Sequence, residues 1–145
     1  MAASAWELYN RAKFGLANGT IKLGVDTFRM QLHKGSSNAS SLVLVTATAL
    51  DNPVNTGGYT AGGKALTTVT WTAGTSVRIF RLDSDDVVFS AVSSAMTSIQ
   101  YAVIRNTGAT KYLLMKSKLS TAIFTVNAGN TLTVQINASG YFTLF

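Results

Sequence analysis

The chain has 145 residues, of which 47% are hydrophobic and only 12% charged, and its formal net charge is +6. A chain of this length fits one domain and can bury about 68–70% of its unfolded surface, so we expect a folded core rather than disorder. There is no cysteine, which excludes disulfides, thiolate nucleophiles and zinc–thiolate sites.

The twelve Lys and Arg residues are scattered singly along the chain. Nucleic-acid binding usually needs a clustered basic patch, so we do not expect it here, and an acidic protein surface is the favoured partner. Residues 1–7 lack the basic and apolar regions of a signal peptide. No apolar run approaches the roughly 18 residues that span a membrane. We therefore expect no signal peptide, no membrane segment and synthesis in the cytoplasm.

Apolar residues spaced three and four apart predict a short amphipathic helix over residues 6–16. Ser4 is placed to cap this helix, Glu7 follows three residues later, and the pair Asn18-Gly19 would end it. Trp6, Tyr9 and Phe14 would then fall largely on one side. That side would either cover the edge of a sandwich or form a docking arm.

From residue 20 the hydrophobic period changes to two, which predicts strands. The expected strands are residues 21–25, 28–33, 65–71, 77–82, 85–90, 98–105, 112–118, 123–126, 131–137 and 142–145. The apolar run 41–50 fits either a strand or a short helix, and we predict a strand for its first half. Short strands at this spacing predict an all-β fold, a two-sheet β-sandwich or jelly roll. Residues 1–145 would form one domain, with a helix or arm at 1–19 and the sandwich at 20–145.

Two blocks carry turn signals. Residues 56–66, TGGYTAGGKAL, predict a turn that feeds a strand, because glycine adopts positive φ at no steric cost. Gly58 and Gly63-Lys64 match most of a phosphate-binding loop, but Ala65 stands where that motif needs Ser or Thr, and β residues follow instead of a helix. These glycines are therefore interpreted as turn formers. Residues 137–140, NASG, predict a bend or hairpin between two final strands.

Residues that support catalysis or metal binding are sparse. Asp83, Asp85 and Asp86 lack the rest of a calcium loop. His33 is the single histidine and has no nucleophile or carboxylate motif beside it, so we expect it on the surface. Glu7 is the single glutamate, and no carboxylate pair stands out. We predict a protein that is not an enzyme and uses no metal or organic cofactor.

Five aromatic residues could line a sugar-binding groove, although core and rim packing explains their alternation better. They are Tyr59, Trp71, Tyr101, Tyr112 and Tyr141.

Several blocks follow one another in a characteristic order: YNRAK at 9–13, NGTI at 18–21, DTFRMQL at 26–32, GGYTAGGKAL at 57–66, DDVVF at 85–89, YAVI at 101–104 and LTVQINASG at 132–140. Together they resemble a family of small virion proteins of tailed bacteriophages, and the resemblance spans most of the chain. The ending YFTLF at 141–145 and the apolar run 41–50 depart from that family. The resemblance implies a capsid decoration (cement) protein or a minor structural protein, with no catalytic residues to carry over.

The resemblance leads to a functional hypothesis. The protein would bind the outer surface of the virion capsid, contact the major capsid protein, stabilise the mature head and act as a dimer or trimer. Aromatic residues and Arg are favoured interface anchors, so the predicted docking residues are Trp6, Tyr9, Arg11, Lys13 and Phe14. The helix could instead be internal packing. The alternative function is a minor tail or fibre component or a carbohydrate-binding surface module.

Overall fold

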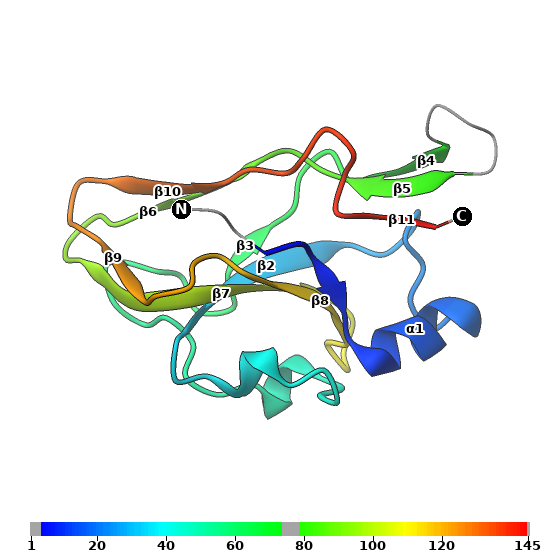
Figure 1. Ribbon diagram of the computed structural model, residues 1–145, viewed down its shortest axis with the longest axis horizontal. Helices are drawn as coiled ribbons and strands as arrows, with labels where there is room; N and C mark the ends of the chain where they lie inside the picture. The colour runs from blue at the N-terminus through cyan, green and yellow to red at the C-terminus, as the bar shows by residue number, and fades with distance from the viewer. Residues whose placement is uncertain (1–3, 74–78, 145) are drawn as a thin grey trace.

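The computed structural model describes residues 4–73 and 79–144. Its strands form two layers, and one short helix lies outside them (Figure 1). The fold is all-β and sandwich-like, as the period-two pattern predicts.

The larger layer is an antiparallel sheet with the strand order β1-β8-β7-β2-β3, here called the main sheet. Its strands are β1 (Glu7–Leu8), β2 (Phe28–Lys34), β3 (Lys64–Ala65), β7 (Met96–Asn106) and β8 (Leu113–Lys118). A further strand, β9 (Phe124–Val126), pairs with the first part of β7.

The second layer consists of two small antiparallel sheets. In one, β6 (Val87–Ser90) pairs with β10 (Thr131–Val134). In the other, β5 (Phe80–Asp83) lies between β4 (Thr70–Ala73) and β11 (Phe142–Leu144). Val87 and Phe89 of β6 are buried while the residues between and after them are exposed, so this layer packs one face on the core.

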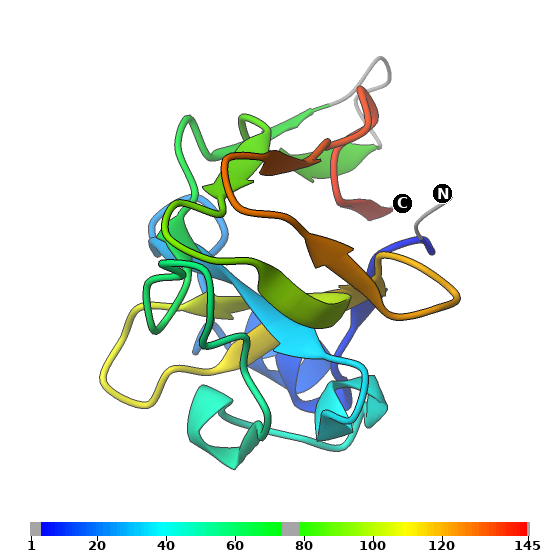
Figure 2. The same ribbon diagram turned by 90° about the vertical axis from the view of Figure 1, so that its left-hand side faces the viewer.

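The opposite face of the main sheet is covered by α1 (Asn10–Ala17) and by the short 3₁₀ helices η1 (Asn38–Ser40) and η2 (Ala47–Ala49). Figure 2 shows the second layer above the main sheet and the two 3₁₀ helices below it. Residues 99–106 of β7 are all buried. A strand loses its alternation of exposed and buried residues when both of its faces are covered.

The predicted helix begins later than expected. Residues 7 and 8 form β1, and the Glu7 carboxylate pairs with the Lys116 ammonium of β8 at 2.7 Å. The Ser4 hydroxyl accepts a hydrogen bond from the Lys118 amide at 2.9 Å, so it does not cap α1. Pairing with a distant strand therefore overrides the local helical spacing. The helix ends at Ala17, beside the predicted Asn18-Gly19.

Two of the predicted strands are absent. Residues 21–25 form a bend and a turn, closed by the Asp26 amide, which donates to the Lys22 carbonyl at 2.8 Å. Ile21 and Leu23 are buried and Val25 is 76% exposed, so the alternation reflects a loop that dips into the core. Residues 41–45 also lack strand structure and form an irregular segment, in which the Val45 carbonyl accepts a hydrogen bond from the Leu113 amide at 3.0 Å.

Other strand predictions are confirmed with shifted ends. The predicted strand 65–71 divides into β3 and β4 in different layers, with Thr68 at φ 51° between them. The bend at 137–140 leads from β10 to β11, which belong to different sheets, so it is not a hairpin. Residues 77, 78 and 145 of two predicted strands lie outside the described residues.

Candidate functional site

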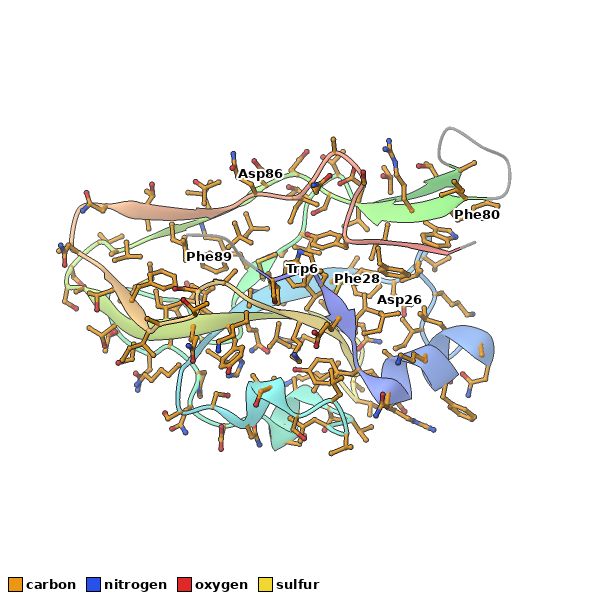
Figure 3. All side chains as sticks on the ribbon, viewed as in Figure 1. Trp6, Asp26, Phe28, Phe80, Asp86 and Phe89 are labelled. Atoms are coloured by element: carbon orange, nitrogen blue, oxygen red, sulfur yellow. The ribbon has the colours of Figure 1, made fainter. Side chains whose placement is uncertain are left out.

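The segment before α1 separates the predicted docking residues. Trp6 packs edge-on against Tyr141, with ring centroids 5.1 Å apart, and Figure 3 shows it between the two layers. The chain then pairs with β8 as β1 and continues into α1 on the opposite face of the main sheet. Trp6 and Phe14 therefore do not share one side of a helix, contrary to the prediction.

Tyr9 is a core residue. It is 0% exposed, its hydroxyl donates to the Ala39 carbonyl at 3.0 Å, and burial raises its pKa. The side chain ties the start of α1 to η1 and has no accessible surface to offer a partner. This removes Tyr9 from the predicted docking residues.

Arg11, Lys13 and Phe14 lie on the exposed face of α1, which packs inward through Ala12 and Gly15. Phe14 is 53% exposed, and the guanidinium carbon of Arg11 lies 4.3 Å from the centre of its ring. A shallow hollow of about 290 Å³ lies on the Lys13 side of α1, lined by Leu8, Lys13, Leu16 and Ala17. We call Arg11, Lys13, Phe14 and this hollow the helix surface.

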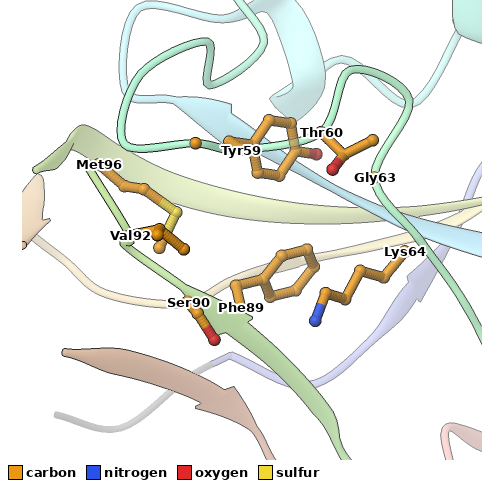
Figure 4. Close-up of a pocket in the computed structure, with 9 residues that line it drawn as sticks. Tyr59, Thr60, Gly63, Lys64, Phe89, Ser90, Val92 and Met96 are labelled. Atoms are coloured by element: carbon orange, nitrogen blue, oxygen red, sulfur yellow. The ribbon is translucent and has the colours of Figure 1, made fainter. Parts of the chain in front are cut away.

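A second candidate site is a pocket between the two layers (Figure 4). It has a volume of about 280 Å³ and is lined by Gly58, Tyr59, Thr60, Gly63, Lys64, Phe89, Ser90, Val92 and Met96. The rings of Tyr59 and Phe89 are stacked with centroids 5.9 Å apart and planes at 27°. The Lys64 amine extends toward the same space from β3. We call this site the interlayer pocket.

Glycines make the interlayer pocket possible. Gly57 has φ +73°, and a Cβ there would lie 2.6 Å from Cγ of Met96. Gly63 has φ +76°, and a Cβ there would overlap the carbonyl oxygen of Met30. Both positions therefore require glycine. The interpretation of these glycines as turn formers is confirmed, and the turns that they form bring Tyr59 onto Phe89.

Two arginines hold the loop that leads into β3. Arg29 and Arg105 are direct cross-strand partners on β2 and β7. Arg29 donates to the carbonyls of Gly62, at 3.1 Å, and of Gly63, and Arg105 donates to the Gly62 carbonyl at 3.4 Å. Burial, followed by the neighbouring Arg29, lowers the pKa of Arg105. In the part of the chain that the structure describes, neither guanidinium has a carboxylate partner.

His33 is buried, so the expectation that it lies on the surface is wrong. It is 2% exposed, and its Nδ1 donates to the Asp51 carbonyl at 2.9 Å. Burial lowers the pKa of His33, and the contact with Asp51 opposes that shift. The ring lies where β2 meets the segment 38–51, and its Nε2 has no hydrogen-bond partner among the described residues.

The aspartates of 83–86 stabilise loops. Asp85 accepts hydrogen bonds from the hydroxyls of Thr67, at 3.0 Å, and Thr68, at 2.6 Å. Asp86 accepts one from the Ile136 amide at 2.7 Å. Within residues 4–73 and 79–144, no three His, Asp or Glu side chains are grouped so that they could hold a metal ion.

A third hollow lies beside Trp6. Its volume is about 380 Å³, and its lining consists of Ser4, Ala5, Trp6, Gln135, Asn137, Gly140 and Tyr141. We call it the Trp6 hollow. It combines an aromatic ring with two amide side chains and carries no charged residue in its lining.

Comparison of the chain with protein-family models, with curated proteins and with solved structures gave no match. Within the described ranges, no helix is long and apolar enough to cross a membrane.

Sequence reasoning missed the interlayer pocket. Its walls come from residues 58–64, 89–92 and 96, which are distant in the sequence. The near-match to a phosphate-binding loop marked the correct loop and the correct lysine, although it suggested a different chemistry. An inward-facing Phe89 on the alternating strand β6 was the other available signal.

Proposed function

We propose that this protein is a non-enzymatic structural component of a bacteriophage virion that binds the outer surface of the capsid. Two arguments support the proposal: the ordered sequence blocks that resemble small virion proteins, and the helix surface. Many copies that bind the mature capsid shell and not its precursor would stabilise the mature form by mass action.

The observation that carries this proposal is the exposed Phe14 beneath Arg11. The Phe14 ring is 53% exposed and offers area that a partner can bury, and the hollow on the Lys13 side of the same helix adds apolar area. Arginine and aromatic residues are enriched among interface anchors. The residues of α1 include Arg11 and Lys13 but no acidic residue.

The partner that fits this surface is an acidic patch of the major capsid protein with an apolar residue at its centre. Positive charge on one side and negative charge on the other accelerate encounter and fix orientation. The apolar centre would fill the hollow between Leu8 and Leu16. An interface of this kind needs about 1,000 Å² or more of buried area to be stable, so neighbouring surface must contribute as well.

Capsid occupancy tests the proposal. Purified capsids that lack this protein are incubated with the wild type, with Phe14→Ala or with Arg11→Glu, and the bound copies are counted after sedimentation. We expect both variants to lose most of their occupancy. The matched control is Val88→Ala, an exposed apolar residue of the second layer, 40% accessible, which should bind normally. Normal occupancy of both helix variants would reject the helix surface. Binding to tails only would reject the capsid role.

A carbohydrate-binding module is the second candidate function, and the Trp6 hollow is the observation that favours it. Sugar recognition combines an aromatic ring that covers a sugar face with polar side chains that read hydroxyls. Trp6, Gln135 and Asn137 supply those groups in one uncharged hollow. Binding of immobilised neutral glycans that is lost in Gln135→Ala and kept in Phe14→Ala would favour this function over capsid binding. No binding to any glycan would remove it.

A further inference from the structure

We propose that the interlayer pocket binds a small organic carboxylate with an apolar body. This site is separate from the helix surface, and the inference does not rest on the capsid role. The pocket, with its volume of about 280 Å³, is slightly smaller than the usual range of small-molecule sites, about 300–1,000 Å³. It therefore suits a medium-chain fatty acid or an aromatic acid rather than a nucleotide.

The walls of the pocket select an apolar body. Tyr59 and Phe89 present stacked rings, and Met96 and Val92 continue the apolar surface on the same side (Figure 4). The Tyr59 ring is held in place because its hydroxyl accepts a hydrogen bond from the Leu32 amide at 2.9 Å. Burial raises the pKa of Tyr59 to about 12, so the ring stays neutral. A fixed, neutral aromatic wall favours hydrocarbon.

The charge of the pocket selects an anion. The single ion pair among the described residues joins Lys116 to Glu7, so Lys64 has no carboxylate partner there. Arg29 and Arg105 add positive charge behind the loop and likewise lack carboxylates. Three cations that lack an ion-pair partner among the described residues favour a negatively charged ligand.

The polar groups favour a carboxylate over a phosphate. The Gly63 amide already donates to the Thr60 carbonyl at 3.0 Å, and the Tyr59 amide donates to the Thr56 carbonyl at 3.2 Å. These two loop amides are therefore not free to donate to a phosphate. Among the side chains of the lining, the ammonium of Lys64 and the hydroxyl of Thr60 have no ion-pair or hydrogen-bond partner in the described residues. One cation with one hydroxyl matches a singly charged carboxylate.

An NMR titration locates the ligand. The ¹⁵N-labelled protein is titrated with octanoate, and octylamine serves as the control with the same apolar body and the opposite charge. We expect saturable shifts confined to residues 57–64 and 89–96 with octanoate, and none at the same concentration of octylamine. Equal responses to both ligands would overturn the role of Lys64. Shifts that centre on residues 8–17 would place the ligand on the helix surface and overturn the proposal.

Substitutions test the same site by the affinity for octanoate. Lys64→Gln should weaken binding about tenfold or more, because a charge-assisted hydrogen bond is lost. The control Lys13→Gln removes the lysine of the other apolar hollow and should leave the affinity unchanged. Val92→Trp should block the pocket, whereas Val88→Trp, on the exposed face of β6, should not. Unchanged octanoate affinity in both Lys64→Gln and Val92→Trp would reject the pocket.

The two proposals fail in distinguishable ways. Lys64→Gln should leave capsid occupancy at the wild-type level, and Phe14→Ala should leave octanoate affinity unchanged. A missing octanoate response with normal capsid binding would therefore reject the pocket alone.

Discussion

The helix surface and the interlayer pocket both combine a cationic side chain with aromatic rings, but the helix surface is convex and the pocket is concave. On α1, the Arg11 guanidinium lies over the exposed ring of Phe14 on a convex surface. In the pocket, Lys64 reaches toward the enclosed rings of Tyr59 and Phe89. A convex pair can be desolvated only by a large partner, whereas a concave pair can be desolvated by a small molecule. If both proposals hold, burial rather than residue type decides the size of the partner at each site.

The largest effect is expected from a substitution that destroys the interlayer pocket and leaves the helix surface intact. In Gly63→Ala, the new methyl group would overlap the Met30 carbonyl at a φ of +76°. Because two backbone segments cannot both stay in place, we expect a loss of about 3 kcal/mol or more in the free energy of unfolding. Thermal denaturation should show a fall of roughly 10 °C in Tm.

Gly19→Ala is the matched control for that substitution. Its φ is +74°, but a Cβ there would meet nothing within 4 Å. We expect a loss of only about 1 kcal/mol, from backbone strain alone. Equal losses in the two variants would show that Gly63 is needed for its φ and not for its approach to β2.

The second prediction concerns the ion pair between Glu7 and Lys116, which joins β1, just before the helix, to β8. Glu7→Gln removes the partner of Lys116, whose side chain is only 10% exposed, although Glu7 itself is 52% exposed. Because solvent screens the pair from the Glu7 side, we expect a loss of about 1–2 kcal/mol in chemical denaturation. The double variant Glu7→Gln with Lys116→Met should recover most of it. No recovery would mean that the loss does not come from the unpaired ammonium.

The third prediction concerns how stability depends on pH in two regions, the segment 38–51 that packs on His33 and the loop 57–64 of the interlayer pocket. The pKa of His33 is lowered in the folded protein, so below its ordinary value of about 6.5 the unfolded chain binds a proton that the native state excludes. The free energy of unfolding should therefore be highest well above pH 6.5 and should fall as the pH drops through 6.5 toward the lowered pKa of the folded state. Hydrogen exchange should accelerate first in residues 38–51, which pack on His33, and later in residues 57–64.

His33→Gln is the control, because glutamine cannot titrate. Its stability should lose the part of the pH dependence between pH 7 and 5 that the wild type shows. Identical pH profiles for the two proteins would show that His33 does not cause the acid response.

The sequence predicted those parts of the fold in which local pattern and tertiary contacts agree. β2, β7 and β8 follow from alternation and strand propensity, and the glycine loop from its turn residues. The start of α1 could not be predicted from its own residues, because the apolar spacing at 6–16 fits a helix and only pairing with β8 converts Glu7 and Leu8 into a strand. The alternation of Ile21, Leu23 and Val25 also predicted a strand wrongly. Ile21 and Leu23 are buried because a loop packs into the core, and not because they belong to a strand.

The candidate sites show the same limit. Arg11, Lys13 and Phe14 lie on the exposed face of the helix, but the burial of Tyr9 depends on η1, some thirty residues later in the chain. The interlayer pocket requires Lys64 and Phe89 to meet across two layers. Local patterns do not contain such long-range contacts, although the glycines at 57 and 63 marked the loop that makes them.

The smallest expected effect on stability tests the convex site directly. Arg11→Gln removes an exposed cation–π contact, so the free energy of unfolding should change by about 0.5–1 kcal/mol at most. Its effect on capsid binding should be larger than its effect on stability, since an outer cation acts mainly on the association rate and on its salt dependence. Association measured at low and high salt should show a slower and less salt-sensitive rate for Arg11→Gln, while Arg11→Lys keeps the charge and most of the rate.

Lys64→Gln measured in parallel should not alter the capsid association rate, because its charge belongs to the concave site. If Lys64→Gln slowed capsid association as much as Arg11→Gln does, the two sites would form one continuous docking face, and the distinction by shape would fail.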